Sequence, residues 1–106
     1  MKLAIILNTK DPETAWNALR LGTKAIETGN STSLFLMGSG VEIESISGGP
    51  FDVAGTLKSY LAKGGELLAC GTCLKVRQQE GGVCPVSTMA QLMELITSCD
   101  KVVSLG

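Results

Sequence analysis

Short apolar runs alternate along the chain with longer stretches in which apolar residues recur at every third or fourth position. The first pattern is typical of strands buried on both faces of a parallel sheet, and the second is typical of amphipathic helices. Strands are predicted at residues 2–7, 33–37, 66–69 and 101–105. Because these strands alternate with helices, the sequence predicts βαβ units in an α/β protein whose sheet is covered on both faces.

Three helices are predicted from the periodic stretches, and each begins after a residue suited to cap it. Asp11 precedes Pro12 at the start of the first helix, and Asp52 precedes the second. Thr88 stands three residues before Gln91, which fits a capping box. The apolar faces expected to be buried are Ala15, Trp16, Leu19, Thr23 and Ile26; Ala54, Leu57 and Leu61; and Met89, Leu92, Met93 and Ile96. We interpret Trp16 and the two methionines as core or subunit contacts.

Three further segments carry weaker signals. Residues 41–47 alternate like a strand but equally fit a short helix. Residues 74–79 predict a short helix, and the glycines at 81 and 82, with the Cys84-Pro85 pair, predict a loop.

The length and the charge of the chain limit its domain organisation and its possible partners. Its 106 residues fit one compact domain spanning residues 1–106. A net charge of −1 gives no sign of the excess positive charge that binding to nucleic acid or to an anionic membrane requires. Only 18% of the residues are charged, and the mean hydropathy is +0.28. We therefore expect copies of the chain to cover part of its surface in a homo-oligomer.

The start of the chain bears on its compartment. The first apolar run ends at Asn8 and no small-residue cleavage site follows, so the sequence predicts no signal peptide. No run approaches the ~20 apolar residues of a membrane span. We expect a cytoplasmic protein with neither nucleic acid nor membrane as a partner. Cysteines in that compartment stay reduced, which favours catalytic, metal-binding or core roles over disulfides.

The counts of His and Cys limit the kinds of catalytic and metal-binding chemistry that the protein can perform. The chain contains no His and 4 Cys, at positions 70, 73, 84 and 99. The absence of His excludes Ser-His and Cys-His catalytic pairs and His-ligated metals. Sites in parallel α/β sheets form at the carboxyl ends of the strands. The segments expected there are residues 8–11, 38–40 and 70–73, so the Cys-Gly-Thr-Cys sequence is the leading chemical candidate.

Sulfur chemistry fits the surroundings of these two thiols. Cys70 ends a predicted strand, and Cys73 lies near the start of the following helix. A thiolate is the nucleophile, and a helix N-terminus or a neighbouring cation favours its formation. Lys75 and Arg77 are close enough along the chain to stabilise a thiolate or a persulfide anion. Without His, this arrangement suits sulfur transfer or thiol–disulfide exchange better than hydrolysis.

The other cysteines and the glycine-rich loop carry less information. Cys99 is expected in the core, and Cys84 is either a bystander or an accessory thiol that resolves or relays. A zinc or iron–sulfur site built from all four cysteines is an alternative, although we expect no metal and no cofactor. The Gly-Ser-Gly sequence at 38–40 lacks the third glycine of a nucleotide loop, because Ile43 stands there. We interpret Gly38 and Gly40 as a tight strand exit that leaves room for a substrate or partner.

Three blocks in register, at residues 34–41, 70–77 and 100–104, resemble the DsrE/DsrF-like family over nearly the whole chain. The small YchN-like members are the nearest likeness. The resemblance implies a three-layer α/β/α sandwich, flavodoxin-like in outline, around a mainly parallel sheet of about five strands. It also implies a homotrimer or homohexamer with a role in intracellular sulfur metabolism.

The resemblance also assigns roles to single residues. In the sulfur-relay members, a cysteine at the place held here by Cys70 carries sulfur as a persulfide and passes it to a partner protein. Cys73 matches a second cysteine found in some members, and Arg77 matches a basic position that steadies the loop or the anion. The family often has a glycine directly after that arginine. Here residues 78–80 intervene before Gly81, so the loop is expected to differ in shape.

Our leading hypothesis from the sequence is therefore a sulfur carrier of the sulfurtransferase type that uses a persulfide at Cys70. Its expected partners are sulfur donor and acceptor proteins or small thiols. Two alternatives stay open: a Cys-x-x-Cys thiol–disulfide oxidoreductase, and an oligomeric binding module without chemistry.

Overall fold

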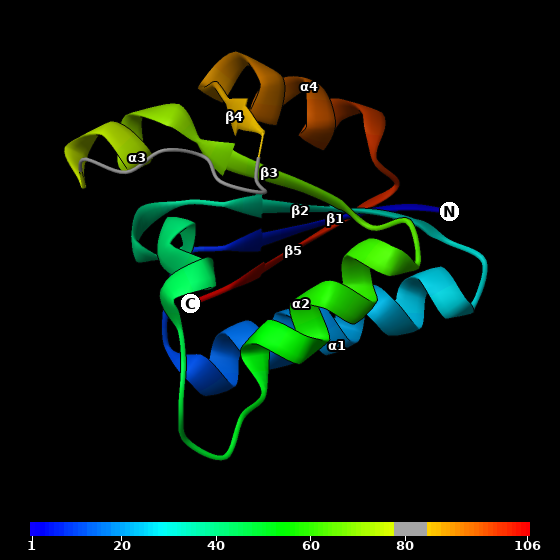
Figure 1. Ribbon diagram of the computed structural model, residues 1–106. Coiled ribbons are helices and arrows are strands. Elements are labelled where there is room, and N and C mark those ends of the chain that lie inside the picture. Colours follow the sequence, from blue (N-terminus) through cyan, green and yellow to red (C-terminus); the bar gives the residue numbers. More distant parts are fainter. Residues whose placement is uncertain (78–84) are drawn as a thin grey trace.

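The computed structural model describes residues 1–77 and 85–106, and it shows a five-stranded sheet flanked by helices (Figure 1). In chain order the elements are β1 (Lys2–Leu7), α1 (Pro12–Glu27), β2 (Ser31–Leu36), η1 (Gly38–Ser45, a 3₁₀ helix), α2 (Val53–Ala62), β3 (Glu66–Cys70), α3 (Gly71–Val76), β4 (Val86–Ser87), α4 (Met89–Ser98) and β5 (Lys101–Leu105). All four strand pairings are parallel, and the strand order is β4-β3-β2-β1-β5.

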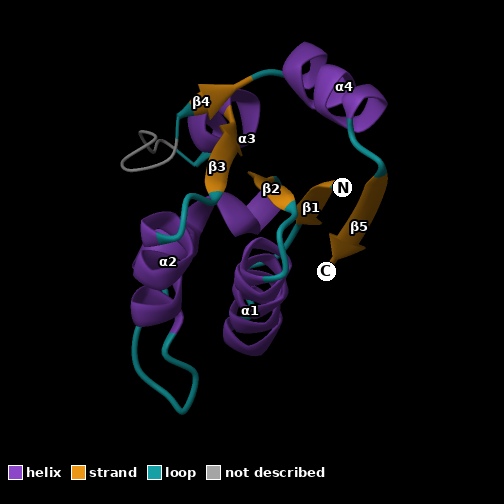
Figure 2. Cartoon of the chain, turned by 90° about the vertical axis from the view of Figure 1, so that its right-hand side faces the viewer, coloured by secondary structure: helices purple, strands orange, loops and turns teal. Residues whose placement is uncertain are grey.

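The helices form two layers on opposite faces of the sheet. Helices α1 and α2 lie side by side against one face, and α4 covers the other (Figures 1 and 2). The short α3 follows directly from the carboxyl end of β3. This is the three-layer α/β/α sandwich that the sequence resemblance implied. It has the outline of a flavodoxin-like fold.

The inner strands β1 and β2 supply the centre of the core. Their register pairs Ile5 with Leu34 and Leu7 with Leu36, and all four of these side chains are fully buried. Burial on both sheet faces explains why the strands appear in the sequence as continuous apolar runs rather than as alternating ones. The predicted strand at residues 33–37 in fact begins two residues earlier, at Ser31, and ends at Leu36.

The predicted caps are confirmed at all three helices. The Asp11 carboxylate accepts the N–H of Thr14 at 3.0 Å, and Asp52 accepts the N–H of Gly55 at 3.0 Å. Thr88 and Gln91 form the reciprocal capping box. Each of these side chains satisfies a backbone donor that the first helical turn leaves without an intrahelical partner.

The buried faces of α1 and α2 differ in part from those predicted, although Ala15, Leu19 and Leu57 are buried as expected. In α1 the buried residues are mostly small: Ala15, Ala18, Leu19, Gly22 and Ala25. Trp16 is half-buried, and the centroid of its ring lies 5.1 Å from that of Phe51. The Arg20 guanidinium lies over the same Trp16 ring. In α2 Ala54 is exposed, whereas Tyr60 is buried against Gly22 of α1. Small residues are needed where two adjacent helices and the sheet meet closely.

The burial of Tyr60 has a polar cause that hydrophobic periodicity does not register. Its hydroxyl donates to the carbonyl oxygens of Glu66 at 2.6 Å and Thr32 at 3.3 Å. Burial raises the pKa of this phenol, with a further contribution from the Glu66 carboxylate. The aromatic ring therefore fills the core while its hydroxyl satisfies two backbone acceptors.

In α4 the buried residues are Leu92 and Leu95. Met89 and Met93 are 52% and 58% exposed, so their interpretation as core residues is wrong, and their interpretation as subunit contacts stays a prediction.

The remaining differences concern short elements. Residues 41–47, which the sequence left open between strand and helix, belong mostly to the 3₁₀ helix η1. The short helix predicted at 74–79 is α3, which begins earlier, at Gly71. The fifth strand, β4, was missed because it is two residues long, and it pairs Ala69 with Val86 and Cys70 with Ser87. The predicted loop glycines at 81 and 82 lie outside the described residues.

Candidate functional site

The three segments expected at the carboxyl edge of the sheet are joined there by hydrogen bonds. The backbone N–H of Lys10 donates to Ser39 Oγ at 2.9 Å, which ties the loop after β1 to the start of η1. The backbone N–H of Gly38 donates to Cys73 Sγ at 3.3 Å, which ties η1 to α3. Residues 8–11, 38–40 and 70–73 therefore form one continuous site, in which the sequence motifs of three separate loops converge.

Cys70 occupies the junction between β3 and α3. It is the last residue of the strand and the N-cap of the helix, and its side chain is only 1% exposed. Strand β4 lies beside this junction in the sheet, because Cys70 pairs with Ser87, and a Cβ atom on Gly71 would lie 3.0 Å from Val86 Cγ1. Cys70 is thus a thiol enclosed by backbone and apolar side chains.

Cys73 differs from Cys70 in both exposure and contacts. It is half-buried, it packs against the edge of the core, and its sulfur is the acceptor for the Gly38 N–H. Among the residues that the structure describes, Cys70, Cys73 and Cys99 are all free thiols. The two cysteines of the motif therefore present one enclosed sulfur and one partly accessible sulfur.

The geometry of the Gly38–Gly40 turn requires its glycines. Gly38 has a φ of +53°, and a Cβ atom there would lie 2.6 Å from Asn8 Oδ1. A Cβ atom on Gly40 would lie 2.5 Å from the carbonyl oxygen of Leu7. The turn therefore packs directly on the end of β1, as the interpretation of a tight strand exit requires. A role of these glycines toward a substrate stays a prediction.

The charged residues of the site are organised around Glu42, which sequence reasoning did not single out. Its Oε2 lies 3.3 Å from Arg77 Nε and 3.7 Å from Lys10 Nζ. Arg77 Nη1 also donates to the carbonyl oxygen of Cys73 at 3.3 Å. Arg77 thus fixes the backbone of α3 while its charge is paired with a carboxylate. Lys75 is exposed, and its role toward an anion stays a prediction.

The structure places the other predicted site residues apart from this cluster or leaves them undescribed. Cys99 ends α4, where it is half-buried against the core. Cys84 lies outside the described residues, so the four-cysteine metal site has no structural test. Within residues 1–77 and 85–106, no group of three metal-ligating side chains is close enough together to hold an ion.

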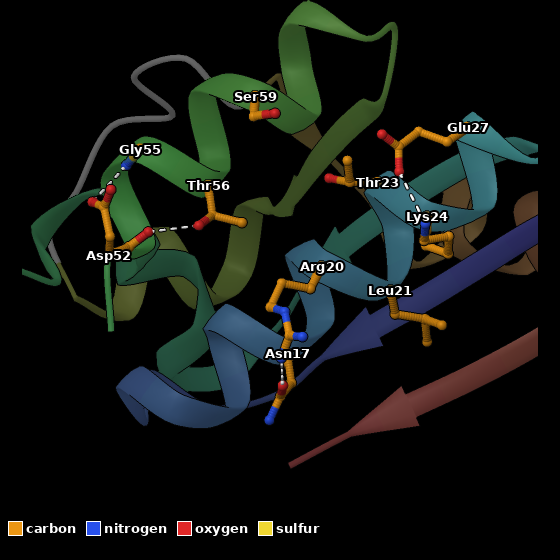
Figure 3. Close-up of a pocket in the computed structure, with 10 residues that line it drawn as sticks. All are labelled: Asn17, Arg20, Leu21, Thr23, Lys24, Glu27, Asp52, Gly55, Thr56 and Ser59. Atoms are coloured by element: carbon orange, nitrogen blue, oxygen red, sulfur yellow. Dashed lines mark hydrogen bonds and ion pairs between the residues drawn. The ribbon is translucent and has the colours of Figure 1, made fainter. Parts of the chain in front are cut away.

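A separate groove of about 700 Å³ runs between α1 and α2, on the outside of that helical layer (Figure 3). Its polar side chains contact their own neighbours. Asp52 accepts the Gly55 N–H at 3.0 Å, and Arg20 donates to Asn17 at 3.1 Å. None of the three cysteine-site segments lines this groove, so it is not part of the same site.

No helix in the described part of the chain is long and apolar enough to cross a membrane.

Fold and site together define a class: parallel α/β/α sandwiches with a Cys-x-x-Cys sequence at the carboxyl edge of the sheet. The DsrE/DsrF-like family model matches residues 1–105, and the chain belongs to that family. The resemblance that the three sequence blocks carried is therefore confirmed. No curated protein matches the chain. Family membership suggests a role in sulfur relay.

Proposed function

We propose that this protein carries sulfur as a persulfide on the Cys70–Cys73 pair, accepting it from a donor and passing it to an acceptor. Family membership is the observation that carries this proposal, and the convergence of three loops on the two thiols supports it. The donor and acceptor are proteins or small thiols, and the protein acts in the cytoplasm.

The chemistry of sulfur carriage suits a site without His. A cysteine thiolate attacks the outer sulfur of a donor persulfide, the donor S–S bond breaks, and the donor leaves as a thiolate. No water is activated and no strong general base is needed. The site offers backbone N–H groups and paired side chains, which position a sulfur atom rather than remove a proton.

Cys70 is the residue to which the family resemblance assigns the persulfide, and its burial suits that role. A persulfide in solution loses its outer sulfur to any thiol that reaches it. At 1% exposure, sulfur held on Cys70 is shielded from small thiols until a partner opens the site. The ion pair between Arg77 and Glu42 ties the end of α3 to η1, and Arg77 also donates to the carbonyl oxygen of Cys73.

The direct test is sulfur loading followed by intact-mass measurement. The protein is incubated with sodium tetrasulfide, desalted and weighed, and we expect a gain of about 32 Da for each sulfur atom bound. The Cys70→Ser/Cys73→Ser double variant should lose this gain, and Cys99→Ser is the matched control that should keep it. A parent that gains no sulfur, or a double variant that gains as much as the parent, would contradict the proposal.

Thiol–disulfide exchange is the second candidate, because two free cysteines stand at the start of a helix with two residues between them. Cys-x-x-Cys pairs at such positions form reversible disulfides. A defined reduction potential for the pair, with disulfide reductase activity and no stable sulfur gain, would favour this function. Slow alkylation of both cysteines at neutral pH would instead favour a binding module without chemistry.

We also propose that the protein assembles as a homotrimer or homohexamer. Met89, Met93 and Val102 expose much of their apolar surface on α4 and the neighbouring edge strand β5. Such side chains become buried where copies of a chain meet. A mass of 11.0 kDa by light scattering at micromolar concentration, which is that of the single chain, would contradict this assembly.

A further inference from the structure

The two cysteines of the site differ so strongly in access that they are not interchangeable. Cys70 is 1% exposed, whereas Cys73 is half-buried. We propose that Cys73 is the thiol that receives sulfur from the donor and that it then passes the sulfur to the enclosed Cys70. This inference rests on the proposed sulfur-carrier function, and it assigns acceptance of the sulfur to Cys73 and storage of the sulfur to Cys70.

Access decides which sulfur a donor reaches first. The attacking sulfur must approach the donor's outer sulfur nearly along the S–S bond, so both atoms need free space. Cys70 has no such space, because its side chain belongs to the buried core and is only 1% exposed. Cys73 lies in the first turn of α3, with part of its surface open to solvent. The donor therefore meets Cys73 first.

The Gly38 amide supplies the polar contact that an incoming sulfur needs. Its N–H donates to Cys73 Sγ at 3.3 Å, and a sulfur that carries negative charge is a stronger acceptor than a neutral thiol. This amide is held in place, because the Met37 N–H donates to the Leu7 carbonyl at 2.9 Å and the Gly40 N–H donates to the Met37 carbonyl at 2.8 Å. A fixed donor of this kind costs no reorganisation when charge appears on the sulfur.

The amide takes over the role that the sequence assigned to cations. Arg77 is paired with Glu42 at 3.3 Å, and it also donates to the carbonyl oxygen of Cys73 at 3.3 Å. It therefore acts as a positioning residue that holds the backbone of Cys73. The sulfur itself accepts the hydrogen bond of the Gly38 N–H.

The second step moves the sulfur between the two cysteines. Residues three apart at the start of a helix lie about 5–6 Å apart at their Cβ atoms, within reach of sulfur chemistry. The Cys70 thiolate attacks the outer sulfur of the Cys73 persulfide, a new S–S bond forms at Cys70, and Cys73 leaves as a thiolate. The Cys70 proton goes to solvent or to the Cys73 thiolate, and nothing is oxidised or reduced overall. Attack on the inner sulfur instead gives a Cys70–Cys73 disulfide and releases hydrosulfide.

The test compares single variants during loading with sodium tetrasulfide. Trypsin cleavage after Lys63 and Lys75 gives one peptide that carries both cysteines, and fragmentation of this peptide assigns the added sulfur to one of them. We expect Cys70→Ser to load at the parental rate, with all of its sulfur on Cys73. Cys73→Ser should load roughly tenfold more slowly or not at all, because its remaining thiol is enclosed. Cys99→Ser is the matched control and should behave as the parent.

A second readout uses the parent protein, so that it does not depend on whether a variant folds. Brief treatment with iodoacetamide should alkylate Cys73 well before Cys70. Loading of Cys73→Ser at the parental rate, or faster alkylation of Cys70, would overturn the inference while leaving sulfur carriage intact. A parent that loads at neither cysteine would overturn sulfur carriage and the division of steps together.

Discussion

Substitution of Gly38 by Ala should destabilise the protein and disturb the sulfur site at the same time. Gly38 has a φ of +53°, in the left-handed region that residues with a Cβ atom rarely adopt. The new Cβ atom would also lie 2.6 Å from Asn8 Oδ1 and 3.4 Å from the Asn8 carbonyl oxygen. Backbone strain and a close contact therefore act on the same turn.

The magnitude follows from adding the two effects. The left-handed conformation costs about 1–2 kcal/mol for a residue with a Cβ atom. The close contact adds roughly 1 kcal/mol, at the low end for overpacking, because the Asn8 side chain is exposed and can turn away. We expect Gly38→Ala to lower the free energy of unfolding by about 2–3 kcal/mol.

Urea denaturation measures this loss, and two further variants separate its causes. Gly48→Ala is the matched control, because Gly48 has a φ of +75° but a Cβ atom added to it would meet no other atom within 4 Å. It should lose only the strain of about 1–2 kcal/mol. Adding Asn8→Ala to Gly38→Ala should remove the contact and recover roughly 1 kcal/mol. Displacement of the Gly38 N–H should also change the alkylation rate of Cys73 in Gly38→Ala but not in Gly48→Ala.

Two results would refute this reasoning. The first is an equal loss of stability in Gly38→Ala and Gly48→Ala, which would mean that the contact with Asn8 has no energetic weight. The second is a fully destabilised Gly38→Ala whose Cys73 reacts at the parental rate, which would mean that the turn does not control the environment of the sulfur.

Three further predictions test the supports of the fold and of the site. Tyr60→Phe removes the hydroxyl that donates to the carbonyl oxygens of Glu66 and Thr32, and it should cost about 1–3 kcal/mol by urea denaturation. Because burial raises the pKa of Tyr60, the parent should lose stability as the pH rises past about 10, the value for an unfolded tyrosine, and Tyr60→Phe should lack that loss. Glu42→Gln should free Arg77 from its ion pair, loosen α3 and speed alkylation of Cys70. The Thr14 N–H and hydroxyl lower the pKa of Asp11, so Asp11→Ala should destabilise the protein at neutral pH. The stability of the variant should approach that of the parent as the pH falls through the lowered pKa, and thermal unfolding measured across pH checks this.

The fold was largely predictable because its main signals are local. Buried strands appear as apolar runs, and helix starts appear as Asp11, Asp52 and Thr88, since a cap needs only its own residue and the next turn. Burial of helix faces was less predictable. Tyr60 is buried with its hydroxyl donating to the carbonyl groups of Glu66 and Thr32, and periodicity carries no information about such contacts. The strand β4 consists of two residues and exists only because β3 lies beside it.

The position of the two cysteines of the candidate site in the fold was predictable, but the residues that support them were not. Placement at the ends of buried strands singled out Cys70 and Cys73 from the sequence. The sequence could not tell the enclosed thiol from the accessible one, because that difference depends on β4 and on the turn at Gly38. Glu42 lies between two buried apolar residues, in a segment whose secondary structure was open. Its carboxylate reaches Arg77 and Lys10 from a kink inside η1, where Glu42 itself has non-helical backbone angles.

The position of the two cysteines in the sheet topology indicates what kind of partner they can reach. In open parallel sheets, small ligands bind in the crevice where the strand order reverses, which here lies between β1 and β5. The cysteine pair lies instead at the end of β3, next to the short strand β4 at the side of the sheet. At that side of the sheet Cys73 is partly exposed, so a partner's surface can reach it. This placement agrees with the proposed transfer of sulfur to a partner protein.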